Sequence, residues 1–111
     1  MTLHDKKFVT TGNKSGLSSD ETIFHYFQSG TTITGKYKGG LIQEGMIIGK
    51  QTEESKIELL YQCLTTEGEL KAGESKGIIS TTENGKLKLT FKWYWLNGDL
   101  SGGTSEYIEI E

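Results

Sequence analysis

The sequence contains no proline, no arginine and only one cysteine. The lack of arginine and the single cysteine each exclude particular functions or structural features. All 12 basic residues are lysines, so the chain lacks the forked guanidinium group that recognises phosphate, carboxylate and guanine. Together with a formal net charge of −3, this argues against nucleic acid as a partner. A single cysteine, Cys63, permits no internal disulfide.

Long hydrophobic runs are also missing. No segment approaches the roughly 20 apolar residues that a membrane-spanning helix needs, and the N-terminal stretch MTLHDKKFVTT lacks the apolar run of a signal peptide. We therefore expect a soluble, cytoplasmic protein with no membrane partner. The 111 residues correspond to one domain, residues 1–111, in which residues 1–5 are expected to form a frayed tail.

What the sequence does contain is a repeated alternation of apolar and polar residues between glycine-rich breaks. Such alternation is typical of strands with one buried and one solvated face. It is clearest where Leu87, Leu89, Phe91, Trp93 and Trp95 share one side, and near the end Ile108 and Ile110 alternate with acids. The predicted strands are residues 6–11, 21–28, 31–38, 41–49, 56–64, 68–80, 86–96 and 105–111.

The connections between these segments are too short for crossover helices, so consecutive strands should pair antiparallel. We predict an all-β, up-and-down meander of about eight strands that closes into a small barrel, because closure removes the exposed sheet edges. A two-sheet sandwich is the alternative. The triplet at 83–85, Glu-Asn-Gly, predicts a tight type I′ hairpin turn. Residues 52–64 also match helical spacing, but their alternation continues to Cys63 and favours a strand.

The stretch GTTITGKY, residues 30–37, matches the first seven places of a phosphate-binding loop, G-x-x-x-x-G-K. Tyr37 stands where the magnesium-binding hydroxyl should be, and no helical pattern follows it. Three threonines and an isoleucine between the glycines are β-branched and favour a strand. We therefore interpret this stretch as a strand with a glycine bend.

Aromatic side chains with polar tips are the best candidates for a binding site. If the barrel holds a ligand, five of them would line the interior: Tyr26, Tyr37, Tyr61, Trp93 and Trp95. A core filled by the same side chains is the alternative.

Glu74 is the sixth candidate. If it shares an inner face with Leu70, Ala72 and Ile78, it would be a buried carboxylate of the kind that contacts ligands. An outward acid paired with Lys71 or Lys76 is the alternative.

The remaining reactive residue types do not form a pattern. His4 and His25 are far apart in sequence, and with a single cysteine they give no metal-ligand spacing, so no metal and no cofactor is expected. His25 should point outward if its neighbours Phe24 and Tyr26 point inward. Cys63 is expected to be a small buried side chain. No catalytic residue is assigned.

The chain resembles a family of small bacterial β-barrel proteins of about 110 residues whose general shape is similar to that of lipocalins and avidin. The resemblance rests on residues 21–30, 35–49, 59–75 and 84–110, with the motifs F-H-Y, Y-x-G-G-x-I and W-x-W. Members often carry the label N-acetylglutamate synthase. Common acetyltransferases bind coenzyme pyrophosphate through a Q/R-x-x-G-x-G/A pattern before a helix, which this chain lacks, so the resemblance transfers no catalytic residues.

Three functional hypotheses follow. The first is binding of a small molecule inside the barrel. The second is an interaction module or homodimer with an outer apolar patch that includes Ile47, Leu60 and Tyr94. The third is an enzyme that uses a tyrosine or Glu74 as an acid or base.

Overall fold

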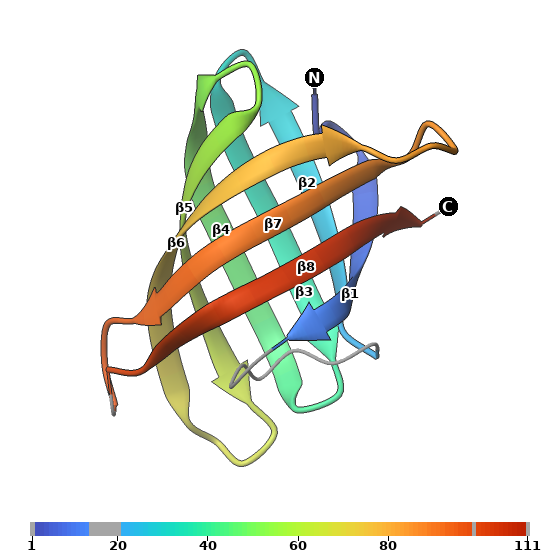
Figure 1. Cartoon of the computed structure of the whole chain (residues 1–111). Coiled ribbons are helices and arrows are strands. Elements are labelled where there is room, and N and C mark those ends of the chain that lie inside the picture. The colour runs from blue at the N-terminus through green and yellow to red at the C-terminus, as the bar shows by residue number, and fades with distance from the viewer. Residues whose placement is uncertain (1, 14–20, 99, 111) are drawn as a thin grey trace.

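The computed structural model describes residues 2–13, 21–98 and 100–110. In these residues the chain folds into eight antiparallel strands (Figure 1). The strands are β1 (Lys6–Asn13), β2 (Ile23–Ser29), β3 (Thr32–Gly39), β4 (Ile42–Glu53), β5 (Lys56–Thr65), β6 (Leu70–Thr81), β7 (Leu87–Trp95) and β8 (Gly102–Ile110). No helix in these residues is long and apolar enough to cross a membrane. The helical alternative for residues 52–64 is wrong, because β4 reaches Glu53 and β5 begins at Lys56.

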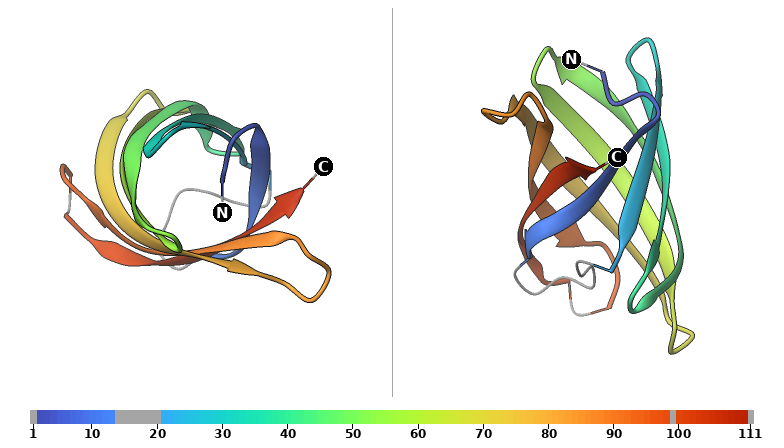
Figure 2. Two further views of the ribbon diagram at one scale, coloured as in Figure 1. Left: turned by 90° about the horizontal axis from the view of Figure 1, so that it is seen from above. Right: turned by 90° about the vertical axis from the view of Figure 1, so that its right-hand side faces the viewer.

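The sheet is a closed barrel in which each strand pairs with its neighbours in sequence and β8 pairs with β1. This last pairing runs from Lys7 opposite Ile110 to Asn13 opposite Ser105, with a bulge between Thr10 and Gly12. Seen from above, the strands form a ring (Figure 2). The predicted barrel is confirmed, and the sandwich alternative is excluded because no pair of sheet edges is left open.

The alternation of the sequence is reproduced as an inner and an outer face. On β7 the residues Leu89, Phe91, Trp93 and Trp95 are buried and the residues between them are exposed, whereas Leu87 and Lys88 at the start of the strand are half buried. On β8 the isoleucines do not occupy the inner face. Ser105 and Tyr107 point inward, whereas Ile108 and Ile110 alternate with them and are only half buried.

One end of the barrel, which we call the closed end, is filled with aliphatic side chains. Leu3, Ile33, Ile57, Ile79 and Leu89 are all at most 2% exposed. The expectation of a frayed tail is therefore wrong for the described part of residues 1–5. The N-terminal segment crosses this end of the ring, where Leu3 completes the core (Figure 2).

A hydrogen-bonded pair of glutamine amides holds this N-terminal segment. The Leu3 N–H donates to Gln28 Oε1 at 2.9 Å, and Gln28 Nε2 donates to Gln51 Oε1 at 2.7 Å. Gln51 Nε2 in turn donates to the Glu54 carbonyl oxygen at 2.7 Å. These amides satisfy one another where the apolar core meets water, so the segment is fixed by both burial and hydrogen bonds.

We expect Leu3→Ala to lower the free energy of unfolding by roughly 3 kcal/mol, because it removes a fully buried side chain and leaves a cavity. Leu70→Ala is the matched control, since Leu70 is 74% exposed and should change stability by less than about 0.5 kcal/mol. Urea unfolding followed by tryptophan fluorescence measures both. Equal midpoints for the two variants would show that the N-terminal segment is not part of the core.

Aromatic rings lie over cross-strand glycines inside the barrel. Tyr37 is opposite Gly45, Tyr61 is opposite Gly73, and Phe91 is opposite Gly77. A Cβ atom on any of these glycines would overlap the ring of its partner. The glycines therefore make the space in which the large rings lie flat against the sheet.

The hairpin between β6 and β7 differs from the predicted two-residue turn. The Thr82 N–H donates to the Lys86 carbonyl oxygen at 2.8 Å, and the Gly85 N–H donates to the Thr82 carbonyl oxygen at 2.9 Å. Of the two residues that a type I′ turn would need at positive φ, only Gly85 has it, at 80°. The connection is thus a longer loop that ends in a left-handed glycine.

Candidate functional site

The half of the barrel away from the closed end contains a cavity of about 60 Å³. Every strand except β1 contributes side chains to it. The lining residues are aromatic, aliphatic or hydroxyl-bearing: Phe24, Tyr26, Tyr37, Ile42, Ile47, Leu59, Tyr61, Ser75, Phe91, Trp93, Trp95, Ser105 and Tyr107. Among the described residues, no charged side chain lines it.

Five of the six residues proposed from sequence are brought together in this lining: Tyr26, Tyr37, Tyr61, Trp93 and Trp95. They come from four strands, β2, β3, β5 and β7. Each lies at an inward position of its alternating strand, so the register of the barrel makes them converge.

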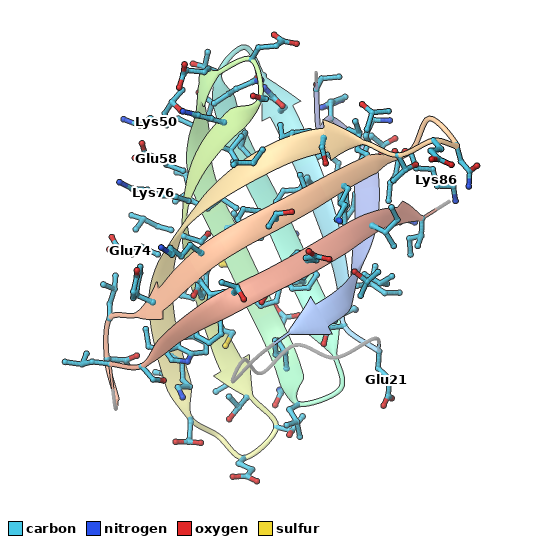
Figure 3. The ribbon with its side chains drawn as sticks, in the orientation of Figure 1. Glu21, Lys50, Glu58, Glu74, Lys76 and Lys86 are labelled. Atoms are coloured by element: carbon cyan, nitrogen blue, oxygen red, sulfur yellow. The ribbon has the colours of Figure 1, made fainter. Side chains whose placement is uncertain are left out.

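The expectation that Glu74, the sixth residue, points into the barrel is wrong. It lies on the outer face of β6, opposite Leu60 and Tyr94, and its side chain points away from the barrel (Figure 3). The inward positions of this strand are Gly73, Ser75, Gly77 and Ile79. The inner face predicted for β6 differs from the observed one by a shift of one residue. The reason is that the apolar residues at the start of this strand lie outside.

The aromatic walls of the cavity are packed against one another. Phe24 and Tyr37 stack with ring centroids 4.8 Å apart and an interplanar angle of 13°. Trp95 meets both Trp93 and Tyr61 edge to face, with centroids 5.6 Å apart in each pair. Rings that support one another in this way have little rotamer freedom, so the walls are preorganised.

The polar groups of the cavity divide into those that the fold uses and those left over. The Trp93 indole Nε1–H donates to Ser105 Oγ at 2.8 Å, and the Tyr37 hydroxyl donates to the Gln62 carbonyl oxygen at 3.2 Å. The hydroxyls of Tyr26, Tyr61 and Ser75 have no hydrogen-bond partner within the described residues.

Those three hydroxyls still border open space. No fully buried side-chain oxygen or nitrogen in the described part of the chain lacks a partner, so hydroxyls without a partner retain some accessible surface, and all three residues line the cavity. Tyr26, Tyr61 and Ser75 therefore offer three donor–acceptor groups, from β2, β5 and β6, to whatever enters.

The tyrosines of the cavity remain neutral well above physiological pH. Burial raises the pKa of Tyr26, Tyr37 and Tyr61 above the ordinary value of 10.0, and neighbouring tyrosines raise it further. Burial likewise raises the pKa of the Cys63 thiol, against smaller lowering effects of Tyr37 and Lys71. The cavity is accordingly an uncharged environment that hydrogen-bonds without carrying a formal charge.

The other residues singled out from sequence lie outside this cavity. Cys63 is buried, as expected, but is not part of the lining. His25 points outward, as expected, and its Nε2 lies 2.8 Å from Asp5 Oδ1. Among the described residues there is no group of three His, Cys, Asp or Glu side chains that could hold a metal ion.

Sequence reasoning missed Ser75, Ser105 and Tyr107 as lining residues. The sequence signal for Ser75 was its spacing. The small residues Gly73, Ser75 and Gly77 are separated by polar ones, and the next residue in this series, Ile79, is aliphatic and buried. The signal for the β8 pair was hidden, because isoleucines have a stronger preference for burial than serine and tyrosine. Only the register against β7 assigns the inner face there.

The fold and the cavity together define a class: small, closed, up-and-down β-barrels with an aromatic interior pocket at one end. A comparison with protein-family models matches residues 1–110 to the avidin-like protein family, and the chain belongs to this family, whose members often bind small molecules. Searches of the curated proteins and of the solved structures gave no match.

Proposed function

We propose that the protein binds a small uncharged molecule, or the uncharged end of a larger one, in the cavity between Trp93, Trp95 and the three free hydroxyls. The observation that supports this most is the convergence of Tyr26, Tyr61 and Ser75 on open space. Natural cores pair their buried polar groups with one another, whereas these hydroxyls are left for a guest.

The chemistry of the lining limits the ligand. A charged group would lose its hydration in a cavity without an opposite charge, at a cost of several kcal/mol or more. A flat, polarisable group would contact the indole and phenol rings. Its polar atoms would accept from or donate to the hydroxyls, as fits an amide, urea or lactone carbonyl.

The size of the cavity also limits the ligand. About 60 Å³ holds only a few water-sized groups, so the buried part of the ligand is small unless side chains move. The polar groups left over are hydroxyls rather than a charged acid–base pair, so binding, and not turnover, is the function proposed.

Native mass spectrometry of the protein isolated quickly from its own cells tests this function. We expect a discrete added mass that is lost on denaturation and that identifies the ligand. A protein that is bare both from cells and after incubation with small neutral amides, ureas and lactones would contradict the proposal.

Filling the cavity should abolish this binding without destroying the barrel. Ser75→Leu places an apolar side chain between Leu59 and Trp93, and we expect at least about a 100-fold loss of affinity, because a hydroxyl and the space are both removed. Ser80→Leu, at an exposed position of the same strand, is the matched control. Isothermal titration with the ligand found above measures affinity, and circular dichroism checks folding. Unchanged affinity in a folded Ser75→Leu variant would place the ligand elsewhere.

A further inference from the structure

The closed ring of strands has one short ladder, between β1 and β2. Within the described residues this ladder contains three pairs: Lys6 with Tyr26, Lys7 with His25, and Phe8 with Phe24. Each of the other seven ladders contains at least six pairs. β1 and β2 also diverge from one another toward one end of the barrel (Figure 2). We call this ladder the β1–β2 seam. Segments with few backbone contacts open at the lowest free energy, so the ring should open first at the seam.

Aromatic contacts hold the seam from the inside of the barrel. Phe8 meets Tyr26 edge to face with ring centroids 5.6 Å apart, and Phe24 meets Tyr107 at 4.9 Å. In both pairs one ring belongs to β2 and the other to β1 or β8. Phe24, Tyr26 and Tyr107 also line the interior cavity. Separation of β1 from β2 therefore opens one side of that cavity.

The N-terminal segment, residues 2–5, fastens β1 to β2 from the outside, and we call it the strap. The Gln28 N–H donates to His4 Nδ1 at 3.2 Å, and Asp5 Oδ1 lies 2.8 Å from His25 Nε2. Both histidines of the chain take part in these two contacts. The contacts are exposed to water, so each can be released at small cost while the rest of the barrel stays folded.

We propose that the barrel opens sideways along the β1–β2 seam while its other ladders stay paired, and that the strap limits this opening. β1 stays with β8, to which six residue pairs and the ion pair between Lys6 Nζ and Glu109 Oε2, at 3.1 Å, attach it. β2 stays with β3 through seven pairs. The opening itself depends on no ligand. Its use as a side entrance to the cavity rests on the proposed function.

Native-state hydrogen exchange of the full chain, followed by NMR at rising urea concentration, tests the opening. We expect amides hydrogen-bonded across the seam to exchange at least about 100-fold faster than the slowest amides of the β4–β5 ladder. Urea should promote this exchange only weakly, because a partial opening exposes little surface. The same exchange rates and the same urea dependence in both ladders would show that the barrel opens only as a whole, and would overturn the proposal.

A core variant separates partial from complete opening. Ile47, expected from sequence on an outer patch, is instead 6% exposed and points inward, whereas Leu60 and Tyr94 are outside as expected. It lies opposite Gly35 and Tyr61, on strands that stay paired when the seam opens. Ile47→Val should therefore speed exchange in the β4–β5 ladder roughly fivefold and leave the seam unchanged. Equal acceleration of both ladders would contradict the proposal.

A strap variant tests what limits the opening. His25→Ala removes the contact with Asp5, which is lost both when the seam opens and when the barrel unfolds. It should speed exchange at the seam by roughly threefold. Lys36→Ala is the matched control, because Lys36 lies opposite His25 on the β3 side, away from the strap, and should change nothing. If both variants exchange at the seam like the native chain, the strap has no such role.

A reversible lock tests the side entrance. Residues directly opposite on antiparallel strands have Cα atoms about 4.5–5.5 Å apart, within the range that a disulfide spans. Lys7→Cys with His25→Cys, in a chain with Cys63→Ser, therefore joins β1 to β2 when oxidised. The disulfide should slow exchange at the seam to that of the β4–β5 ladder, and reduction should restore it.

The same lock should reduce the quenching of Trp93 and Trp95 by acrylamide, a small neutral amide. These are the chain's two tryptophans, and both line the cavity. Unchanged exchange in the oxidised form would rule out the opening, and slowed exchange with unchanged quenching would rule out the entrance. Neither measurement uses the ligand sought under the proposed function, so a failure of that function is detected separately.

Discussion

Gly39→Ala is expected to lower the free energy of unfolding by at least about 4 kcal/mol, which is a large part of the stability of a domain this size. Gly39 ends β3 with φ at +118°, a region that L-residues rarely occupy. A Cβ atom here would also overlap the Glu21 carbonyl oxygen, which is backbone and cannot rotate away. The Thr22 hydroxyl, itself fully buried, donates to the Gly39 carbonyl oxygen at 3.0 Å and fixes this approach.

Gly68→Ala separates the strain of a positive φ from the overlap of an added Cβ atom with its neighbours. Gly68 has φ at +87°, but no atom lies within 4 Å of the place that an added methyl group would occupy, so the substitution adds conformational strain without overlap. We expect it to cost only about 1 kcal/mol. Urea unfolding at constant m-value measures both variants. Similar midpoints would show that the chain at Gly39 relaxes and that its close approach to Glu21 is not required.

Alkaline pH is expected to remove about 3 kcal/mol of stability between pH 10 and pH 11. Burial raises the pKa of Tyr26, Tyr37 and Tyr61 in the folded state above the ordinary value of 10.0. Well below pH 10 all three are protonated in both states, so the stability is fully present. As the pH rises through 10 the unfolded chain loses protons that the folded chain keeps, and each tyrosine then costs about 1 kcal/mol between pH 10 and pH 11.

Tyr26→Phe should reduce the slope of stability against pH above pH 10 by about one third, because one of three contributing hydroxyls is removed. Phe24→Leu is the control. It removes packing against Tyr37 but no proton, so it should lower the curve by the same amount at every pH. The measurement is urea unfolding from pH 8 to pH 11. Parallel curves for Tyr26→Phe and the native chain would show that Tyr26 does not titrate as a buried group.

Among the described residues, no charged side chain lines the cavity, and this leads to a further expectation. The proposed ligand would contact hydroxyls and rings whose protonation does not change near neutral pH, so its binding should be insensitive to pH in that range.

The strands and most of the aromatic lining could be predicted from local residue patterns alone. The alternation in residues 86–96 assigned Trp93 and Trp95 to the interior, because a strand of period two allows only two faces and one of them was entirely apolar. Short connections determined the meander, and the need to remove two sheet edges favoured closure. Tyr26, Tyr37 and Tyr61 followed from the same periodicity.

Periodicity could not assign every position, and there the pairing of strands in the closed barrel was needed. Where glycines interrupt β6, both faces contain apolar residues, and only the pairing with β5 and β7 places Ser75 inside and Glu74 outside. The burial of Leu3 depends on the ring of strands that receives it, and on a hydrogen bond to Gln28, which lies 25 residues away. The convergence of three unpaired hydroxyls depends likewise on strands that are distant in sequence. Such contacts are set by barrel closure and register, which local residue preferences do not encode.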